Sequence, residues 1–215
     1  MAVAVKICGL TDAKAITTAV DAGVNFIGLV FFRRSPRFVS IECAVDLISG
    51  VPRAVTTVGL FVDPTDSQIE KTLKVIRLGV LQLHGKETPA RVAAIRKKFN
   101  VPVMKAIGVA TRADVLGASD YQSVADWLLF DAKPVAAATR PGGNATAFEW
   151  PLMKTYQGSL PWMLAGGLTA KNVADAVKAS GARVVDVSSG VETQPGRKSP
   201  AKIRAFIKAV RAIPG

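Results

Sequence analysis

Residues 161–191 read PWMLAGGLTAKNVADAVKASGARVVDVSSGV, and this stretch contains one complete strand–helix–strand pattern. The apolar run at its start and the Val-rich run near its end are typical of short buried strands. Between them, Val173 and Val177 have the four-residue spacing of a helix, which we expect Thr169 to cap and Gly181 to end. A helix that joins two buried strands predicts that the strands run parallel.

The same pattern repeats along the chain. Short apolar runs begin at about residues 3, 26, 56, 80, 102, 127, 161 and 183. Consecutive runs start about 26 residues apart on average, which is enough for a strand, a helix and two loops. Eight such units without a linker predict one α/β domain, a single (β/α)8 barrel over residues 1–215. An open doubly wound sheet is the alternative, but it would favour fewer strands and a Gly-rich dinucleotide turn after the first strand, where the chain has only Cys8-Gly9-Leu10-Thr11.

The segments between the apolar runs differ in helical character. Clear helices are expected in three further places: residues 12–22 with Thr11 as the cap, the segment before Gly79, and the segment that Ser199-Pro200 opens. Residues 116–124 are typical of a poor helix. Residues 135–146 are rich in Gly, Ala and Thr and indicate a long loop.

Composition excludes several classes of protein. Apolar residues make up 49% of the chain, which excludes disorder, and no apolar run is long enough for a spanning helix. The first residues lack a secretory signal, so we expect a soluble cytoplasmic protein without a membrane partner. Cys8 and Cys43 are expected to be reduced thiols, and Cys43, in an apolar helical pattern, is expected in the core. A single histidine, His84, excludes a histidine-rich metal site and most Ser-His-Asp triads.

The net charge is strongly positive, because 28 Lys and Arg stand against 16 Asp and Glu to give +12. Such a charge suits either nucleic acid or a small anionic ligand. Many of the cations fall opposite the apolar stripes of the predicted helices: Lys97, Lys98, Lys202, Arg204, Lys208 and Arg211. We interpret these as solvated and expect no nucleic-acid partner. A basic nucleic-acid-binding protein is kept only as the alternative from a different class.

Polar residues gather where the predicted strands end. In a (β/α)8 barrel the carboxyl ends of the strands carry the functional site. The two-residue period of a strand points one set of side chains into that end of the barrel: Lys6 and Cys8 on the first strand, Gln82 and His84 on the fourth, Asp131 on the sixth, and Asp186 and Ser188 on the eighth. Buried charges are costly without partners, so this set predicts a site rather than an ordinary core.

Glycines follow the last two strands. Residues 164–169 (LAGGLT) and 187–191 (VSSGV) would let backbone N–H groups approach an anion. Each glycine could instead serve only to turn the chain into the next helix. Two such turns on adjacent strands favour a phosphate site that includes Gly166, Gly167, Ser188, Ser189 and Gly190.

The same motifs occur together in one known family. The chain contains, in order, KICGL at 6–10, SPR at 35–37, VGLFV at 58–62, LQLHG at 81–85, LFD at 129–131, PGG at 141–143, LAGGL at 164–168 and DVSSGVE at 186–192. In this order and register the chain resembles the phosphoribosylanthranilate isomerases of tryptophan biosynthesis. The resemblance implies a (β/α)8 barrel, no metal or organic cofactor, and isomerisation of N-(5'-phosphoribosyl)anthranilate to 1-(2-carboxyphenylamino)-1-deoxyribulose 5-phosphate.

The resemblance also implies catalytic roles. The reaction is an Amadori rearrangement, which needs one acid and one base. By resemblance Asp131 is the general acid that protonates the furanose ring oxygen, and Cys8 is the general base that removes the C2' proton. We expect partial burial or the anionic substrate to keep the Asp131 proton in place near neutral pH. A thiol is mostly protonated at that pH, and Lys6, one pleat below on the same face, is our own candidate for activating Cys8.

Further residues are expected to bind the substrate. Arg37 matches the arginine that holds the anthranilate carboxylate in the family, His84 lies in the site by resemblance, and residues 134–146 would form a lid. The complete expected set is Lys6, Arg37, His84, Gly142, Gly143, Gly166, Gly167, Asp186, Ser188, Ser189 and Gly190.

The chain departs from the family pattern at a few positions. Asn144-Ala145 and Phe148-Glu149-Trp150 replace the usual Thr-Gly and Phe-Asp-Trp, and Arg197-Lys198-Ser199 lacks an acidic residue. Another phosphate-binding barrel is the alternative function, either an indoleglycerol-phosphate synthase or the histidine-pathway sugar isomerase. The first needs a lysine and glutamate array, and the second an aspartate where Cys8 stands. A monomer is the default expectation, and a dimer through helix faces stays open.

Overall fold

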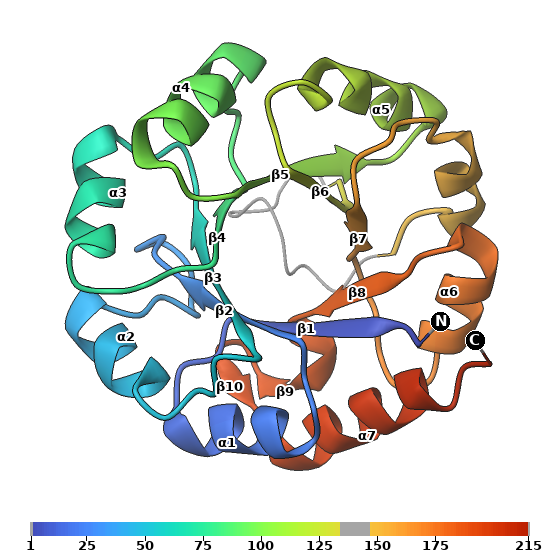
Figure 1. The fold of residues 1–215 in the computed structure, drawn as a ribbon. Coiled ribbons are helices and arrows are strands. Elements are labelled where there is room, and N and C mark those ends of the chain that lie inside the picture. The colour runs from blue at the N-terminus through green and yellow to red at the C-terminus, as the bar shows by residue number, and fades with distance from the viewer. Residues whose placement is uncertain (1, 134–146, 215) are drawn as a thin grey trace.

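Eight parallel strands form a closed barrel, and helices surround it (Figure 1). The computed structural model describes residues 2–133 and 147–214. The strands are β1 (Ala4–Cys8), β2 (Phe26–Val30), β3 (Thr56–Phe61), β4 (Val80–Leu83), β5 (Val103–Val109), β6 (Trp127–Ala132), β7 (Trp162–Leu164) and β8 (Val184–Val187). Each strand pairs with the next in chain order, and β8 pairs with β1. The predicted (β/α)8 barrel is confirmed, and the alternative of an open sheet is wrong.

Helices cover the outside of the barrel between the strands (Figure 1). They are α1 (Ala13–Asp21), α2 (Ile41–Ile48), α3 (Asp66–Leu73), α4 (Pro89–Phe99), α5 (Arg112–Leu116), α6 (Val173–Ser180) and α7 (Pro200–Arg211). Short 3-10 helices are η1 (Gly117–Tyr121), η2 (Trp150–Thr155) and η3 (Ser189–Val191), and β9 (Glu192–Gln194) pairs antiparallel with β10 (Arg197–Lys198). In the part of the chain described here, no helix is both long and apolar enough to cross a membrane.

The weaker helix predictions have different outcomes. The poor helix expected at residues 116–124 is the end of α5 followed by η1. The long loop expected at residues 135–146 lies outside the described residues.

The predicted start of α1 is wrong by one residue. Asp12, not Thr11, is the cap, because its carboxylate accepts the backbone N–H of Ala15 at 2.8 Å. At the start of α7 the prediction is confirmed, since the Ser199 hydroxyl accepts the backbone N–H of Lys202 at 3.3 Å.

The predicted cap of α6 is also wrong. The helix begins after Asn172, three residues beyond Thr169. The Asn172 side chain accepts the backbone N–H of Thr169 at 2.7 Å and donates to the Gly167 carbonyl at 3.0 Å. Asn172 therefore fixes the turn that follows β7, and Thr169 is part of that turn.

The barrel interior changes from apolar to polar along its axis. Apolar side chains fill much of it, among them Val58, Val80, Met104, Leu129, Met163 and Val184. Further toward the carboxyl ends of the strands, the buried side chains include Lys6, Gln82, Asp131 and Asp186. Burying four polar groups together requires partners for them, so the change marks the site.

The prediction that Cys43 lies in the core is wrong. Cys43 is exposed on α2. The helix instead buries Ala44 and packs Leu47 and Ile48 partly against the core. Apolar residues lie on more than one side of this short helix, and Val45 is 37% exposed. The apolar pattern alone therefore could not identify the buried face.

Candidate active site

The carboxyl ends of β6, β7 and β8 surround a cavity. It is lined by residues 131–133, 165–168 and 186–189. Six of the predicted site residues share this cavity: Asp131, Gly166, Gly167, Asp186, Ser188 and Ser189. Lys133 also lines it and was missed from the sequence, although it stands two positions after Asp131 and so has the same strand parity.

Two turns at this cavity require glycine. Gly166 has a φ of 89° and Gly167 one of 63°, a left-handed conformation that other side chains rarely adopt. A Cβ on Gly166 would lie 2.7 Å from the backbone nitrogen of Ala132, and one on Gly190 would clash with the Leu168 carbonyl. The glycines therefore turn the chain and also permit a close backbone approach, which an anion site needs.

Asp131 is buried between two polar contacts. Its Oδ1 accepts the backbone N–H of Ala132 at 2.9 Å, and its Oδ2 lies 3.4 Å from the Nε2 of His84. The other ring nitrogen of His84, Nδ1, lies 3.0 Å from the Nε2 of Gln82. Asp131 on β6 and His84 at the end of β4 are thus brought together at the barrel mouth, over the strand β5 that lies between them.

Lys6 and Asp186 form a buried ion pair between the first and last strands. They are register partners on β1 and β8, and Lys6 Nζ lies 3.0 Å from Asp186 Oδ1. Burial opposes the charge on Lys6, but the Asp186 carboxylate and the Cys8 side chain outweigh this and raise the pKa of Lys6 above its ordinary value. The ammonium therefore stays charged inside the barrel.

Cys8 ends β1 beside this ion pair. It is 4% exposed and packs with Val30 and Leu60. Burial raises the pKa of the Cys8 thiol above its ordinary value, while the ammonium groups of Lys6 and Lys198 act in the opposite direction. Lys6 thus lowers the pKa of Cys8, as the sequence predicted, but burial outweighs this effect.

Arg37 belongs to a second cluster of buried charges. Its Nε and Nη2 contact the two carboxylate oxygens of Glu192 at 2.7 and 2.8 Å. Lys198 contacts the same carboxylate at 2.8 Å and donates to the hydroxyl of Ser188 at 3.1 Å. Burial raises the pKa of Glu192, but the two cations outweigh this and lower it. The role expected of Arg37 stays a prediction, and its guanidinium here holds a carboxylate of the chain itself.

The partners of Arg37 were missed from the sequence. Glu192 closes the DVSSGVE motif, which could have singled it out, whereas nothing local distinguishes Lys198 from the other lysines. Burial lowers the pKa of Lys198 and outweighs the opposite effect of Glu192.

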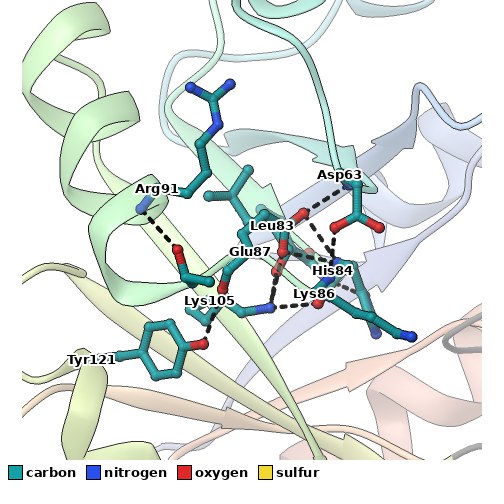
Figure 2. A network of polar contacts seen from close by, with 11 residues as sticks. Asp63, Leu83, His84, Lys86, Glu87, Arg91, Lys105 and Tyr121 are labelled. Atoms are coloured by element: carbon teal, nitrogen blue, oxygen red, sulfur yellow. Dashed lines mark hydrogen bonds and ion pairs between the residues drawn. The ribbon is translucent and has the colours of Figure 1, made fainter.

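Figure 2 shows a third buried ion pair, next to His84. Lys105 Nζ lies 3.0 Å from a carboxylate oxygen of Glu87 and donates to the Gly85 carbonyl at 2.8 Å. Glu87 in turn accepts the backbone N–H of Gly85, and its own carbonyl accepts the Tyr121 hydroxyl at 2.9 Å. None of these contacts was predicted, because Lys105 and Tyr121 come from other elements than Glu87 and no short motif joins them to it.

Some predictions fall on the undescribed part of the chain. Gly142, Gly143 and the lid expected at residues 134–146 lie outside the described residues. Among the residues the structure does describe, no group of three or more His, Cys, Asp or Glu side chains is placed to hold a metal ion.

Comparison with known proteins identifies the family. The family model for N-(5'-phosphoribosyl)anthranilate isomerase matches residues 5–209. The chain belongs to this isomerase family. Relatives that carry the same name include the enzyme of Paramagnetospirillum magneticum, which is 54% identical over 211 residues that cover 98% of each chain. The enzyme of Paracoccus denitrificans is 51% identical over 212 residues that cover 99% of each chain.

Solved structures of phosphoribosylanthranilate isomerases share the fold. The Thermus thermophilus structure matches with a TM-score of 0.86 at 30% identity, covering 98% of this chain and 100% of that one. The Thermotoga maritima structure matches with a TM-score of 0.85 at 32% identity, covering 97% and 98%. A further isomerase structure, with a TM-score of 0.82 at 31% identity over 97% and 98%, holds reduced 1-(o-carboxyphenylamino)-1-deoxyribulose 5-phosphate. The resemblance inferred from the motifs is confirmed, so the chain is an isomerase of the tryptophan pathway by family.

Proposed function

We propose that the chain converts N-(5'-phosphoribosyl)anthranilate to 1-(2-carboxyphenylamino)-1-deoxyribulose 5-phosphate by an Amadori rearrangement, with Asp131 as general acid and Cys8 as general base. The observation that carries this proposal is the arrangement at the barrel mouth. A buried carboxyl on β6 and a buried thiol on β1 are presented at the same end of the barrel, and a cavity with glycine turns adjoins the carboxyl.

Asp131 acts first. It gives its proton to the furanose ring oxygen, the bond between that oxygen and C1' breaks, and the lone pair of the anthranilate nitrogen forms a C1'=N iminium. The aldose ring is then open, and Asp131 is left as a carboxylate. The backbone N–H of Ala132 and the His84 ring stand at its two oxygens to hold the carboxyl plane.

Cys8 acts second. Its thiolate removes the C2' proton, the released electron pair forms a C1'=C2' double bond, and the iminium electrons return to nitrogen. The resulting enolamine tautomerises to the ketone, which completes the aldose-to-ketose change. Because burial raises the pKa of Cys8, only a minor fraction is thiolate at neutral pH, and the nearby ammonium groups of Lys6 and Lys198 keep that fraction from being smaller.

The substrate carries two anionic groups, and the chain offers a place for each. The phosphate would bind at the glycine turns after β7 and β8, with Gly166, Gly167, Ser188, Ser189 and Gly190 as the wall and Lys133 as a cation. The anthranilate carboxylate would bind Arg37. Asp186 would orient the sugar hydroxyls while it balances Lys6. Gly142 and Gly143, which lie outside the described residues, stay proposed as substrate-binding residues.

The location, oligomeric state and partners of the enzyme are also part of the proposal. We infer a cytoplasmic protein that works as a monomer on a small molecule, without a nucleic-acid partner. The absence of a nucleic-acid partner is supported by the helix surfaces, where some cations already have carboxylate partners. Lys98, for example, lies 2.7 Å from Asp66.

Turnover of freshly generated phosphoribosylanthranilate, followed by loss of its fluorescence, tests the proposal. We expect the native chain to convert it and Cys8→Ala and Asp131→Asn each to lose about a hundredfold or more in kcat. Cys43→Ala is the matched control, because this cysteine is exposed on α2 and should leave the rate unchanged. An inert native chain with a cooperative melting transition would contradict the proposed reaction and leave only the fold and the anion cavity.

A further inference from the structure

Gln82 is an unusual side chain for its position. It lies on β4 inside the barrel with no exposed surface, in register with Leu60 and Met104 on the neighbouring strands. Its amide nitrogen lies 3.0 Å from Nδ1 of His84, and its Oε1 has no hydrogen-bond partner among the described residues. An amide that is buried at this cost needs a reason beyond packing.

The contact between Gln82 and His84 determines where the imidazole carries its proton. An amide nitrogen can only donate a hydrogen bond, so the Nδ1 that faces it must accept. A neutral ring then has its proton on Nε2. That nitrogen is the one that lies 3.4 Å from Oδ2 of Asp131.

The same contact offers no acceptor for a second ring proton. A doubly protonated imidazole would direct its Nδ1 proton at the N–H of Gln82, with no acceptor between them. An imidazolium beside Asp131 would favour the ionised carboxylate, which is the wrong state for an acid that must give up a proton. A neutral N–H toward Oδ2 orients the carboxyl without placing a full charge beside it.

His84 is held through its backbone as well as through its ring. Figure 2 shows Lys105 and Glu87, which make the backbone contacts, beside Leu83 and His84. Lys105 donates to the carbonyls of Leu83 and Gly85, the residues on either side of His84, at 3.4 and 2.8 Å. Glu87 holds the backbone N–H of Gly85 at 3.0 and 3.1 Å and balances the charge of Lys105. The buried ion pair thus restrains both peptide groups that flank His84 and fixes the position of the backbone that carries the ring.

We propose that Gln82 is a positioning residue, which holds His84 as the neutral tautomer protonated on Nε2 and thereby presents Asp131 to the substrate in a fixed orientation without an adjacent cation. The proposal rests on the proposed function in one respect, namely that Asp131 is the general acid. Gln82 itself does not touch the reacting atoms in this account and acts only through His84.

Nitrogen NMR of the imidazole tests the tautomer without any assay. His84 is the only histidine in the chain, so 15N-histidine labelling gives the two nitrogen signals of a single ring. In the native protein at neutral pH we expect a protonated Nε2 and an unprotonated Nδ1. In Gln82→Glu, the new carboxylate accepts a proton from Nδ1, so we expect that nitrogen to become protonated. A native ring with its proton on Nδ1 would overturn the proposal, because Gln82 would then present its oxygen to the ring.

Steady-state kinetics test the consequence for Asp131. We expect Gln82→Glu and Gln82→Met to lower kcat by about tenfold or more while KM changes by less than about threefold, because neither variant removes a substrate contact. Met104→Leu, a swap of similar volume at the register partner of Gln82, controls for repacking of the barrel interior and should change neither constant. Equal losses in the control and the Gln82 variants, or unchanged kcat in Gln82→Glu, would overturn the positioning role.

The two measurements separate this proposal from the function on which it rests. A native chain that shows the Nε2-protonated ring but turns over no substrate contradicts the proposed reaction and leaves the tautomer standing. Normal turnover with the proton on Nδ1 contradicts the role of Gln82 and leaves the reaction standing. Melting temperatures of all variants show whether each is folded when it is assayed.

Discussion

Cys8 is held in its thiol form by burial, although two ammonium groups oppose this. If its thiolate is the base, the rate must rise as the thiol ionises, and the raised pKa moves that rise to higher pH than for an ordinary cysteine. In Asp131→Asn, where the proposed acid can no longer titrate, we expect the residual kcat/KM to increase from pH 7 to about 9. Initial rates over this range in one mixed buffer measure the rise. A flat profile in a chain that stays folded would show that Cys8 does not supply the rate-determining base.

The sequence alone could predict some residues of the candidate site better than others. Asp131, Asp186 and Ser188 could be predicted at one end of the barrel because strand parity and the position of the strand end are both local properties. The role of Arg37 stays a prediction, and its carboxylate partner lies 155 positions away, with no local rule to join the two. Cys43 was misplaced because a short helix with apolar residues on several sides does not reveal its buried face.

Helix α5 depends on one carboxylate at its start. Asp114 accepts the backbone N–H groups of Ala110 and Thr111, each at 2.9 Å. Burial opposes its charge, but the backbone hydrogen bonds and Lys133 outweigh this and lower the pKa of Asp114 to about 2. We expect Asp114→Ala to lower the free energy of unfolding by about 1 kcal/mol at pH 7.

The pH dependence of that loss has a defined sign. The pKa of Asp114 is lowered on folding, so its contribution is complete above the ordinary carboxyl pKa and disappears as the pH falls through the folded value near 2. Urea unfolding at pH 7 and at successively lower pH should show the difference between native and variant shrinking below roughly pH 4. Asp120→Ala, an exposed change in η1, is the control, and an equal loss there would argue against the cap.

Elements were predicted better than their ends. All eight strand runs and the first and last helices were located from apolar periodicity, which reports a whole segment. The caps of α1 and α6 were wrong because several neighbouring side chains could each accept the first backbone N–H groups, and only the path of the chain selects one. The pair Thr11 and Asp12 shows this, since both are good caps by residue type.

The closure of the barrel places a charged pair where β1 meets β8. Lys6 and Asp186 are neighbours there, and neither is open to solvent. We expect Lys6→Met to lower the free energy of unfolding by roughly 3 to 5 kcal/mol, because it leaves a buried carboxylate unpaired. The double variant Lys6→Met/Asp186→Leu should recover most of that loss. Denaturant unfolding of the two single variants and the double variant measures the coupling, and additive losses would contradict it.

The architecture of the molecule was the most predictable feature of all. A repeat of strand and helix eight times over leaves few ways to bury every apolar face, and closure is the one that this chain adopts. What the repeat does not contain is the set of contacts across the barrel mouth. Pairs such as His84 with Asp131 form only once β4 and β6 lie on either side of β5 in the barrel.

The exposed sulfur of Cys43 leaves the outer wall of the molecule open to oxidation by air. Two copies that collide there can become joined by a disulfide, which requires no complementary surface between them. A preparation kept without a reducing agent is therefore expected to contain covalent pairs that run at twice the mass on a non-reducing gel. Sedimentation or gel filtration of such a sample would then detect dimers that are held together by the Cys43 disulfide alone. The oligomeric state of the barrel should therefore be measured in the presence of a reducing agent.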